Sequence, residues 1–125
     1  MSSLTITLDR AFGAFYPGEV VTGRATWRLN KNPGAVELRL FWYTEGKGDF
    51  DMELVDTYAF SSTSAQGEED FSVTLPDMPY SFSGKLISII WAIELVAQPG
   101  DHMARTEIVM SPTGREMLLS EVKNQ

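Results

Sequence analysis

The sequence predicts an all-β protein, an antiparallel sandwich or barrel of about seven strands. Apolar side chains recur at every second residue over most of the chain, which is the period of a strand with one buried face. Turns rich in Gly and Pro interrupt this alternation at short, regular intervals. The length of 125 residues, with 43% hydrophobic content, is enough for one domain with a buried core. No stretch predicts a helix of more than two turns.

The first two strands are expected at residues 4–8 and 21–29. In the first, leucine and isoleucine alternate with threonine. The second begins directly after a Pro17-Gly18 turn in the stretch "FYPGEVVTG". Its predicted buried face consists of Val21, Gly23, Ala25, Trp27 and Leu29. Because Gly23 has no side chain to bury, it predicts either a bulge or the close approach of another strand.

Three further strands are expected at residues 36–43, 50–60 and 71–75. The predicted inner face of the first is Val36, Leu38, Leu40 and Trp42. In the second, Phe50, Met52 and Leu54 share a register with Tyr58 and Phe60, while Val55 competes from the other register. This conflict predicts a bulge near Val55. The polar stretch at 61–70 is interpreted as a loop.

The most apolar segment of the chain, "LISIIWAIELVA" at 86–97, has a pattern that fits a helix as well as a strand. Its isoleucine and tryptophan content and its flanking Gly84 and Pro99 favour a central strand covered on both faces. A last strand is expected at 102–111. We therefore expect a domain over residues 1–111, and a tail at 112–125 that forms a short helix, an added strand or a disordered end.

Charge and composition exclude several classes of partner. The net charge of −7 and the isoelectric point near 4.6 disfavour binding to nucleic acid or to anionic lipid, and no Lys/Arg cluster offsets them. No apolar run reaches the ~20 residues of a membrane helix, and the first residues do not resemble a secretory signal. We expect a cytoplasmic protein without membrane insertion. With no cysteine, packing alone must hold the fold.

Candidate catalytic groups are sparse. His102 is the one histidine and follows Asp101 in a turn, but no Gly-x-Ser-x-Gly motif accompanies it. The stretch "SFSGK" lacks the first glycine of a phosphate-binding loop and precedes a strand. We predict no catalytic, cofactor-binding or metal-binding residue, and therefore no enzyme.

Asp49, Asp51 and Glu53, which alternation places on one strand face, are candidate ligands for a calcium ion. Glu68, Glu69 or Asp70 would complete the site. We interpret these carboxylates instead as the solvated face of a strand, where they also protect an edge against aggregation. A metal-dependent enzyme using Asp49, Asp51 and His102 is the least favoured function.

An unusual apolar face is the main functional signal. Phe41 and Tyr43 share a face with Glu37 and Arg39, opposite the predicted core residues of the same strand. On the strand at 86–97, Leu86, Ile90 and Val96 likewise lie opposite the core set. Such faces are covered by a partner, by a second subunit, by the tail or by loops. We predict Phe41, Tyr43 and Ile90 as partner-binding residues, with Phe41 replaceable at little cost to stability.

Two stretches resemble the arrestin family. "YPGEVVTGRATW" is similar to the arrestin pattern in which a Pro-Gly-Glu turn starts a strand carrying Val-x-Gly. "FSVTLPDMPYSFSGKLISIIWAIEL" resembles a later block of the family, with Leu-Pro, a proline-containing loop, Ser-Phe-x-Gly and a long central strand. The order and spacing agree over most of residues 4–111. The matched residues given structural roles are Pro17, Gly18, Glu19, Gly23, Pro76, Ser81, Phe82 and Gly84, with Phe82 expected to close one end of the sandwich.

The resemblance implies an immunoglobulin-like β-sandwich and a non-enzymatic adaptor or scaffold. Arrestins have two such sandwiches, whereas this sequence holds one. "MPYSF" is not a Pro-Pro-x-Tyr ligase-binding motif, and the basic phosphate-sensing surface of receptor-binding arrestins has no counterpart here. We therefore predict a module that binds unidentified protein partners through a strand edge or an apolar sheet face. The alternative is a structural homo-oligomer that buries the same face against its copy.

Overall fold

The computed structural model describes residues 2–10, 14–46, 51–84, 87–99, 102–112 and 117–118, and within them it contains strands and no helix. Seven strands have six or more residues and two, β6 and β9, have two residues each. Their bounds are β1 (Ser3–Leu8), β2 (Val20–Arg28), β3 (Ala35–Gly46), β4 (Met52–Ala59), β5 (Gln66–Thr74), β6 (Phe82–Ser83), β7 (Ile87–Gln98), β8 (His102–Ile108) and β9 (Met117–Leu118). No described segment is a helix that would span a membrane.

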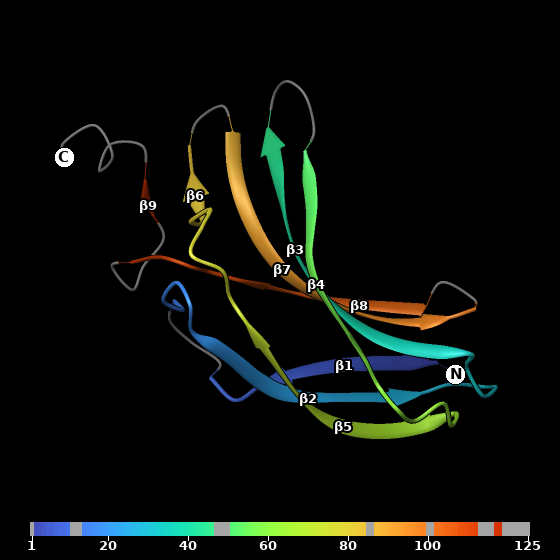
Figure 1. Ribbon diagram of the computed structural model, residues 1–125. Helices are drawn as coiled ribbons and strands as arrows, with labels where there is room; N and C mark the ends of the chain where they lie inside the picture. The colour runs from blue at the N-terminus through green and yellow to red at the C-terminus, as the bar shows by residue number, and fades with distance from the viewer. Residues whose placement is uncertain are drawn as a thin grey trace.

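The strands form two sheets, which confirms the predicted β-sandwich. One has the order β1-β2-β5, and the other has the order β4-β3-β7-β6-β9, with β8 also paired to β7. The long pairings β1–β2, β2–β5, β3–β4, β3–β7 and β7–β8 are all antiparallel. Figure 1 shows that β3 and β7 curve strongly, so that the first half of β3 and the second half of β7 lie over the smaller sheet. The remaining halves of both strands rise away from it.

The β2 strand shows why the chain needs glycine at position 23. Gly23 pairs with Leu8 on one side and with Phe71 on the other, with no shift in register. A Cβ atom placed there would collide with the carbonyl oxygen of Thr7 and would lie 2.9 Å from the Phe71 ring. Of the two expectations for Gly23, close strand approach is therefore correct and a bulge is not.

Trp27 is a buried core residue, and its contacts explain why the first half of one strand was not predicted. The stretch at 66–70 was expected to be a loop, but it forms the first half of β5. Trp27 pairs with Gly67, and its indole ring lies directly over that glycine. The ring also tilts against Phe60 and donates from Nε1 to the Ser64 carbonyl at 3.0 Å. One tryptophan covers this end of β5, so the strand needs no apolar side chains there. Its polar sequence therefore lacks the alternation that predicts a strand.

The predicted bulge at Val55 is confirmed. Leu40 pairs with Asp56 and Phe41 pairs with Leu54, so Val55 is an extra residue in β4. Side chains before and after it therefore follow different registers. Met52 and Leu54 lie on one face of the sheet, whereas Tyr58, opposite the core residue Leu38, lies on the other.

The β7 strand is the central strand predicted from its composition, not a helix. It pairs with β3 along its whole length, with β8 over its second half and with β6 near its start. Seven consecutive residues, 91–97, are buried. Both faces of the strand are therefore covered, as expected.

The two family-like motifs lie side by side in space. Gly18 has a φ of +80°, which glycine adopts without strain. The Leu75 amide donates to the Glu19 carbonyl at 2.9 Å, and the Gly18 amide donates to the Pro76 carbonyl at 3.4 Å. Further on, buried Ser81 accepts from the Met110 amide through its hydroxyl at 2.9 Å. The turn residues thus join the start of β2, the end of β5 and the segment after β8.

Phe82 and the tail contribute a short extension of the larger sheet. Phe82 is half-buried in β6 and pairs with Ile89. In the tail, Met117–Leu118 runs parallel to Phe82–Ser83. Residues 113–116 and 119–125 lie outside the described part of the chain.

We expect Gly67→Ala to lower the free energy of unfolding by about 1 to 3 kcal/mol, because the new methyl group would overlap the Trp27 ring. Gly34→Ala is the matched control: its Cβ atom would lie 3.6 Å from the nearest atom, an ordinary contact. The control should change stability by no more than about 0.5 kcal/mol. Urea unfolding followed by tryptophan fluorescence measures both variants, and equal stabilities would contradict the packing described here.

Candidate functional site

The candidate site is a group of apolar side chains on the outer face of the larger sheet. Side chains of directly opposed residues lie on the same face of a sheet. Phe41 is opposed to Leu54 on β4 and to Ala92 on β7, and Tyr43 is opposed to Met52 and to Ile90. We call these six residues the outer apolar patch: Phe41, Tyr43, Met52, Leu54, Ile90 and Ala92. The structure thus brings Phe41, Tyr43 and Ile90 together on one face, as the sequence suggested.

Phe41 is buried, contrary to the expectation that it is dispensable for stability. Only 4% of its surface is exposed. Its ring stacks on Tyr43 at 5.9 Å between centroids, and the Arg105 guanidinium lies over it at 4.9 Å from the centroid. Ala92 on β7 is opposed to Phe41 on β3 and to Glu107 on β8, so only a methyl group separates these two positions on this face. Phe41 therefore forms the floor of the patch, and Tyr43 is its half-buried neighbour.

Charged residues border the patch on one side. Glu94 is 7% exposed and accepts from the Arg105 Nη2 atom at 3.0 Å. Arg39, opposed to Glu94, donates from Nε to Glu37 at 2.8 Å. Within the described residues, every buried side-chain polar atom has a hydrogen-bond partner. This border is therefore already neutralised, and it holds Arg105 over the aromatic rings.

Sequence reasoning missed the two most exposed members of the patch. Met52 and Leu54 are 59% and 53% exposed. The signal was present in the predicted bulge at Val55, because an extra residue turns the side chains before it to the other face. Taken together with the pairing to β3, that bulge places both residues beside Tyr43.

Among the carboxylates considered as calcium ligands, the described ones make contacts within the sheet. Glu53 accepts from the Trp42 indole nitrogen at 3.1 Å, and the Asp51 backbone bonds to Thr44. Asp49 lies outside the described residues. Across the described ranges, no cluster of three or more His, Asp or Glu side chains is placed to hold a metal ion.

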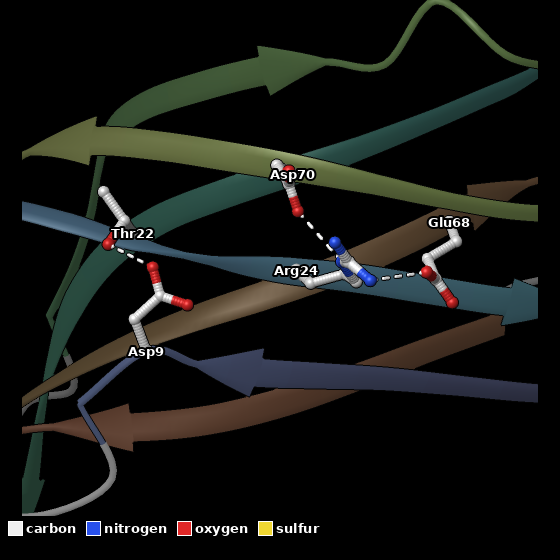
Figure 2. Close-up of polar contacts among 5 residues, drawn as sticks. All are labelled: Asp9, Thr22, Arg24, Glu68 and Asp70. Carbon is white, nitrogen blue, oxygen red and sulfur yellow. Dashed lines mark hydrogen bonds and ion pairs between the residues drawn. The ribbon is translucent and has the colours of Figure 1, made fainter.

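Two of the three acidic residues of β5 pair with a single arginine. Figure 2 shows Arg24 between Asp70 and Glu68, at 2.9 Å and 2.7 Å. The hydrogen bond to Asp70, followed by the attraction of Asp70 and Glu68, raises the pKa of Arg24 above its ordinary value. Glu69 turns elsewhere and accepts from the Ser62 amide at 3.0 Å. These contacts are exposed surface pairs, typical of a solvated sheet face.

His102 lies beside a different feature, an open hollow of about 400 Å³ at the β2–β3 turn. Residues 29–33, Pro99 and His102 line it. These residues include Lys31 and two asparagines, but no serine, threonine or carboxylate. The described lining therefore offers His102 neither a hydroxyl nucleophile nor an orienting carboxylate. Asp101 lies outside the described residues.

The fold is arrestin-like. No protein-family model and no curated protein matches the sequence. Among solved structures, the chain is similar to Spo0M, a sporulation control protein from Bacillus subtilis, with a TM-score of 0.63 and 18% identity over 88% of this chain. Spo0M has the arrestin-like fold. The chain spans about half, 49%, of the length of Spo0M.

Two enzymes show weaker similarity. A β-glucosidase from Listeria innocua aligns with a TM-score of 0.48, 13% identity and 88% of this chain, but with only 16% of the enzyme. A superoxide reductase from Ignicoccus hospitalis aligns with a TM-score of 0.43 and 17% identity, over 87% of this chain and 80% of the reductase. At these values, neither supports an inference about this chain.

We expect Phe41→Ala to destabilise the protein by about 3 kcal/mol, because it removes a buried ring and leaves a cavity under Arg105. Leu54→Ala, at the opposed position on β4, is the control and should cost no more than about 1 kcal/mol. Thermal and urea unfolding distinguish the two. A stable Phe41→Ala variant would show that this ring does not support the sheet.

Proposed function

We propose that this chain is a non-enzymatic protein-interaction module of the arrestin-like type, an adaptor or scaffold that binds a partner through the outer apolar patch. The observation that carries the proposal is the position of Met52 and Leu54, which expose more than half of their surface beside Tyr43. Contiguous apolar side chains on the surface of a soluble domain mark interaction sites.

The composition of the patch suits a protein interface. Aromatic residues, methionine and arginine are enriched at such interfaces. Tyr43 is held from below by Phe41 and from the side by Arg105, whose guanidinium lies 5.5 Å from its ring centroid. A ring held in this way loses little conformational freedom on binding. Met52 and Leu54 add flexible apolar contact next to this rigid anchor.

The wider properties of the chain support an adaptor over a catalyst. Spo0M, which shares the fold, is named for a control function. The described residues present no metal cluster, and the hollow at His102 has neither a hydroxyl nor a carboxylate among its lining residues. We place the module in the cytoplasm, where its net charge of −7 keeps it soluble and away from anionic lipid and nucleic acid.

The test is a double substitution, Met52→Thr with Leu54→Thr, in the full chain. Threonine keeps the strand preference but removes the exposed apolar surface. We expect the melting temperature to change by only a few degrees, since both positions are exposed. Affinity capture from the native host with the variant should lose the proteins retained by the wild-type chain.

Met78→Thr is the matched control, because Met78 is 70% exposed in the loop after β5. The control should retain the same proteins as the wild type. Retention of an unchanged set by the double variant would refute the proposal. Sedimentation velocity adds a separate outcome: a wild-type dimer that the double variant converts to a monomer would establish the homo-oligomer instead.

A further inference from the structure

The β4 strand lies at one end of its sheet and pairs only with β3 in the described sheet order. Every residue of β4 is exposed except Val55, which is half-buried. The strand contains neither glycine nor proline. An edge strand of this kind presents unpaired backbone groups to any chain that approaches it.

The pairing with β3 shows which backbone groups are open. The Thr44 amide donates to the Asp51 carbonyl at 2.9 Å, and the Asp51 amide donates to the Thr44 hydroxyl at 2.9 Å, so the backbone groups of these two residues face each other. Hydrogen-bonded and non-hydrogen-bonded pairs alternate along an antiparallel ladder. Met52 and Leu54 therefore occupy the non-hydrogen-bonded positions, and they direct both N–H and C=O away from β3.

Beyond the bulge, one outward-pointing backbone donor of the edge is already used within the chain. Thr57 also points its N–H away from β3, but that N–H donates to the Asp56 carboxylate at 2.8 Å. The open part of the edge that adjoins the outer apolar patch is thus the stretch from Met52 to Leu54. These are the same two residues whose side chains extend the outer apolar patch.

The two faces of this open stretch differ in character. Met52 and Leu54 lie on the outer face, whereas Asp51, Glu53 and Asp56 are opposed to inner-face residues of β3 and lie on the other side. None of the ion pairs within the described residues includes these three carboxylates. An added strand here would meet an apolar surface on one face and negative charge on the other.

We propose that β4 accepts an extended segment of a protein partner as an additional antiparallel strand at Met52–Leu54, and that this segment alternates apolar with basic residues. This inference rests on the proposed function, and it adds the chemical character of the segment that the partner would supply. Apolar residues of the segment would pack on Met52, Leu54 and Tyr43. Basic residues, pointing to the other face, would approach Glu53 and its neighbouring carboxylates. A second copy of β4 would bring like charges together and is disfavoured.

The test measures binding of labelled peptides of about ten residues to the full chain by fluorescence anisotropy. The probe alternates valine and lysine, and the matched peptides alternate valine and glutamate or group the lysines at one end. We expect only the alternating valine–lysine peptide to bind well. No binding by this peptide overturns the inference, and equal binding by the grouped peptide shows general charge attraction and also overturns it.

Two backbone-methylated forms of the valine–lysine peptide test the strand pairing itself. Valines opposed to Met52 and Leu54 would point their N–H groups toward β4, and lysines would point theirs away. Methylation of the valine nitrogens should weaken binding roughly tenfold or more, since it removes several hydrogen bonds. Methylation of the lysine nitrogens should leave it nearly unchanged. Equal binding by both forms would contradict strand addition while leaving an interaction through the face, and therefore the proposed function, intact.

Glu53→Gln tests the charge on the protein side, because glutamine still accepts from the Trp42 indole. We expect the variant to bind the valine–lysine peptide about two- to fivefold more weakly. Asp77→Asn, exposed in the loop after β5 and beside Gly18, removes one negative charge elsewhere and should have no effect. An equal loss for both variants would show that only net charge matters and would contradict the site. A dimer that Leu54→Thr dissociates would assign the edge to a second copy.

Discussion

The pairing of β3 with β7 is the constraint on which the rest of the structure depends. Twelve residues of each strand are opposed without interruption, from Ala35 with Gln98 to Gly46 with Ile87. Both faces of this ribbon carry apolar side chains. Pairs such as Leu38 with Leu95 point into the core, and pairs such as Tyr43 with Ile90 point outward. The smaller sheet covers part of the inner face. The apolar side chains of the outer face need a different cover, from other parts of the chain or from a partner.

Because the ribbon is curved, different segments of the chain cover different parts of it. The smaller sheet covers one half of the inner face, where Trp27 and Phe71 are buried. Near the other half, the Trp91 indole donates to the Pro79 carbonyl at 2.7 Å, which ties down the proline-containing segment. On the outer face, Arg105 covers Phe41 but leaves Met52 and Leu54 exposed. The surface we assign to partners is the part of the ribbon and its edge strand that the chain itself does not cover.

Much of the fold follows from alternation in the sequence, and the failures have physical causes. The buried residues of β2, the bulge at Val55 and the strand nature of β7 were all predicted correctly. The first half of β5 was missed because Trp27, far away in the sequence, supplies its apolar cover. The candidate site was predicted in part, because Phe41, Tyr43 and Ile90 share a face. The burial of Phe41 was not predicted, because the covering Arg105 comes from β8, and the sequence alone does not give the β7–β8 register that places it over the ring. To predict that Met52 and Leu54 belong to the site, one needs to know that β4 pairs with β3 as well as where the bulge lies.

The central claim is that a rigid ribbon of β3 and β7 supports an open edge at Met52 and Leu54. Amide hydrogen exchange of the isolated protein, measured residue by residue by NMR, tests it most directly. The account predicts slow exchange along the buried part of β7 and at Glu53, which is hydrogen-bonded to β3 in the alternating ladder. It predicts much faster exchange at Met52 and Leu54 on either side. Equal protection of Glu53 and its two neighbours would show that this edge is already covered and would contradict the account.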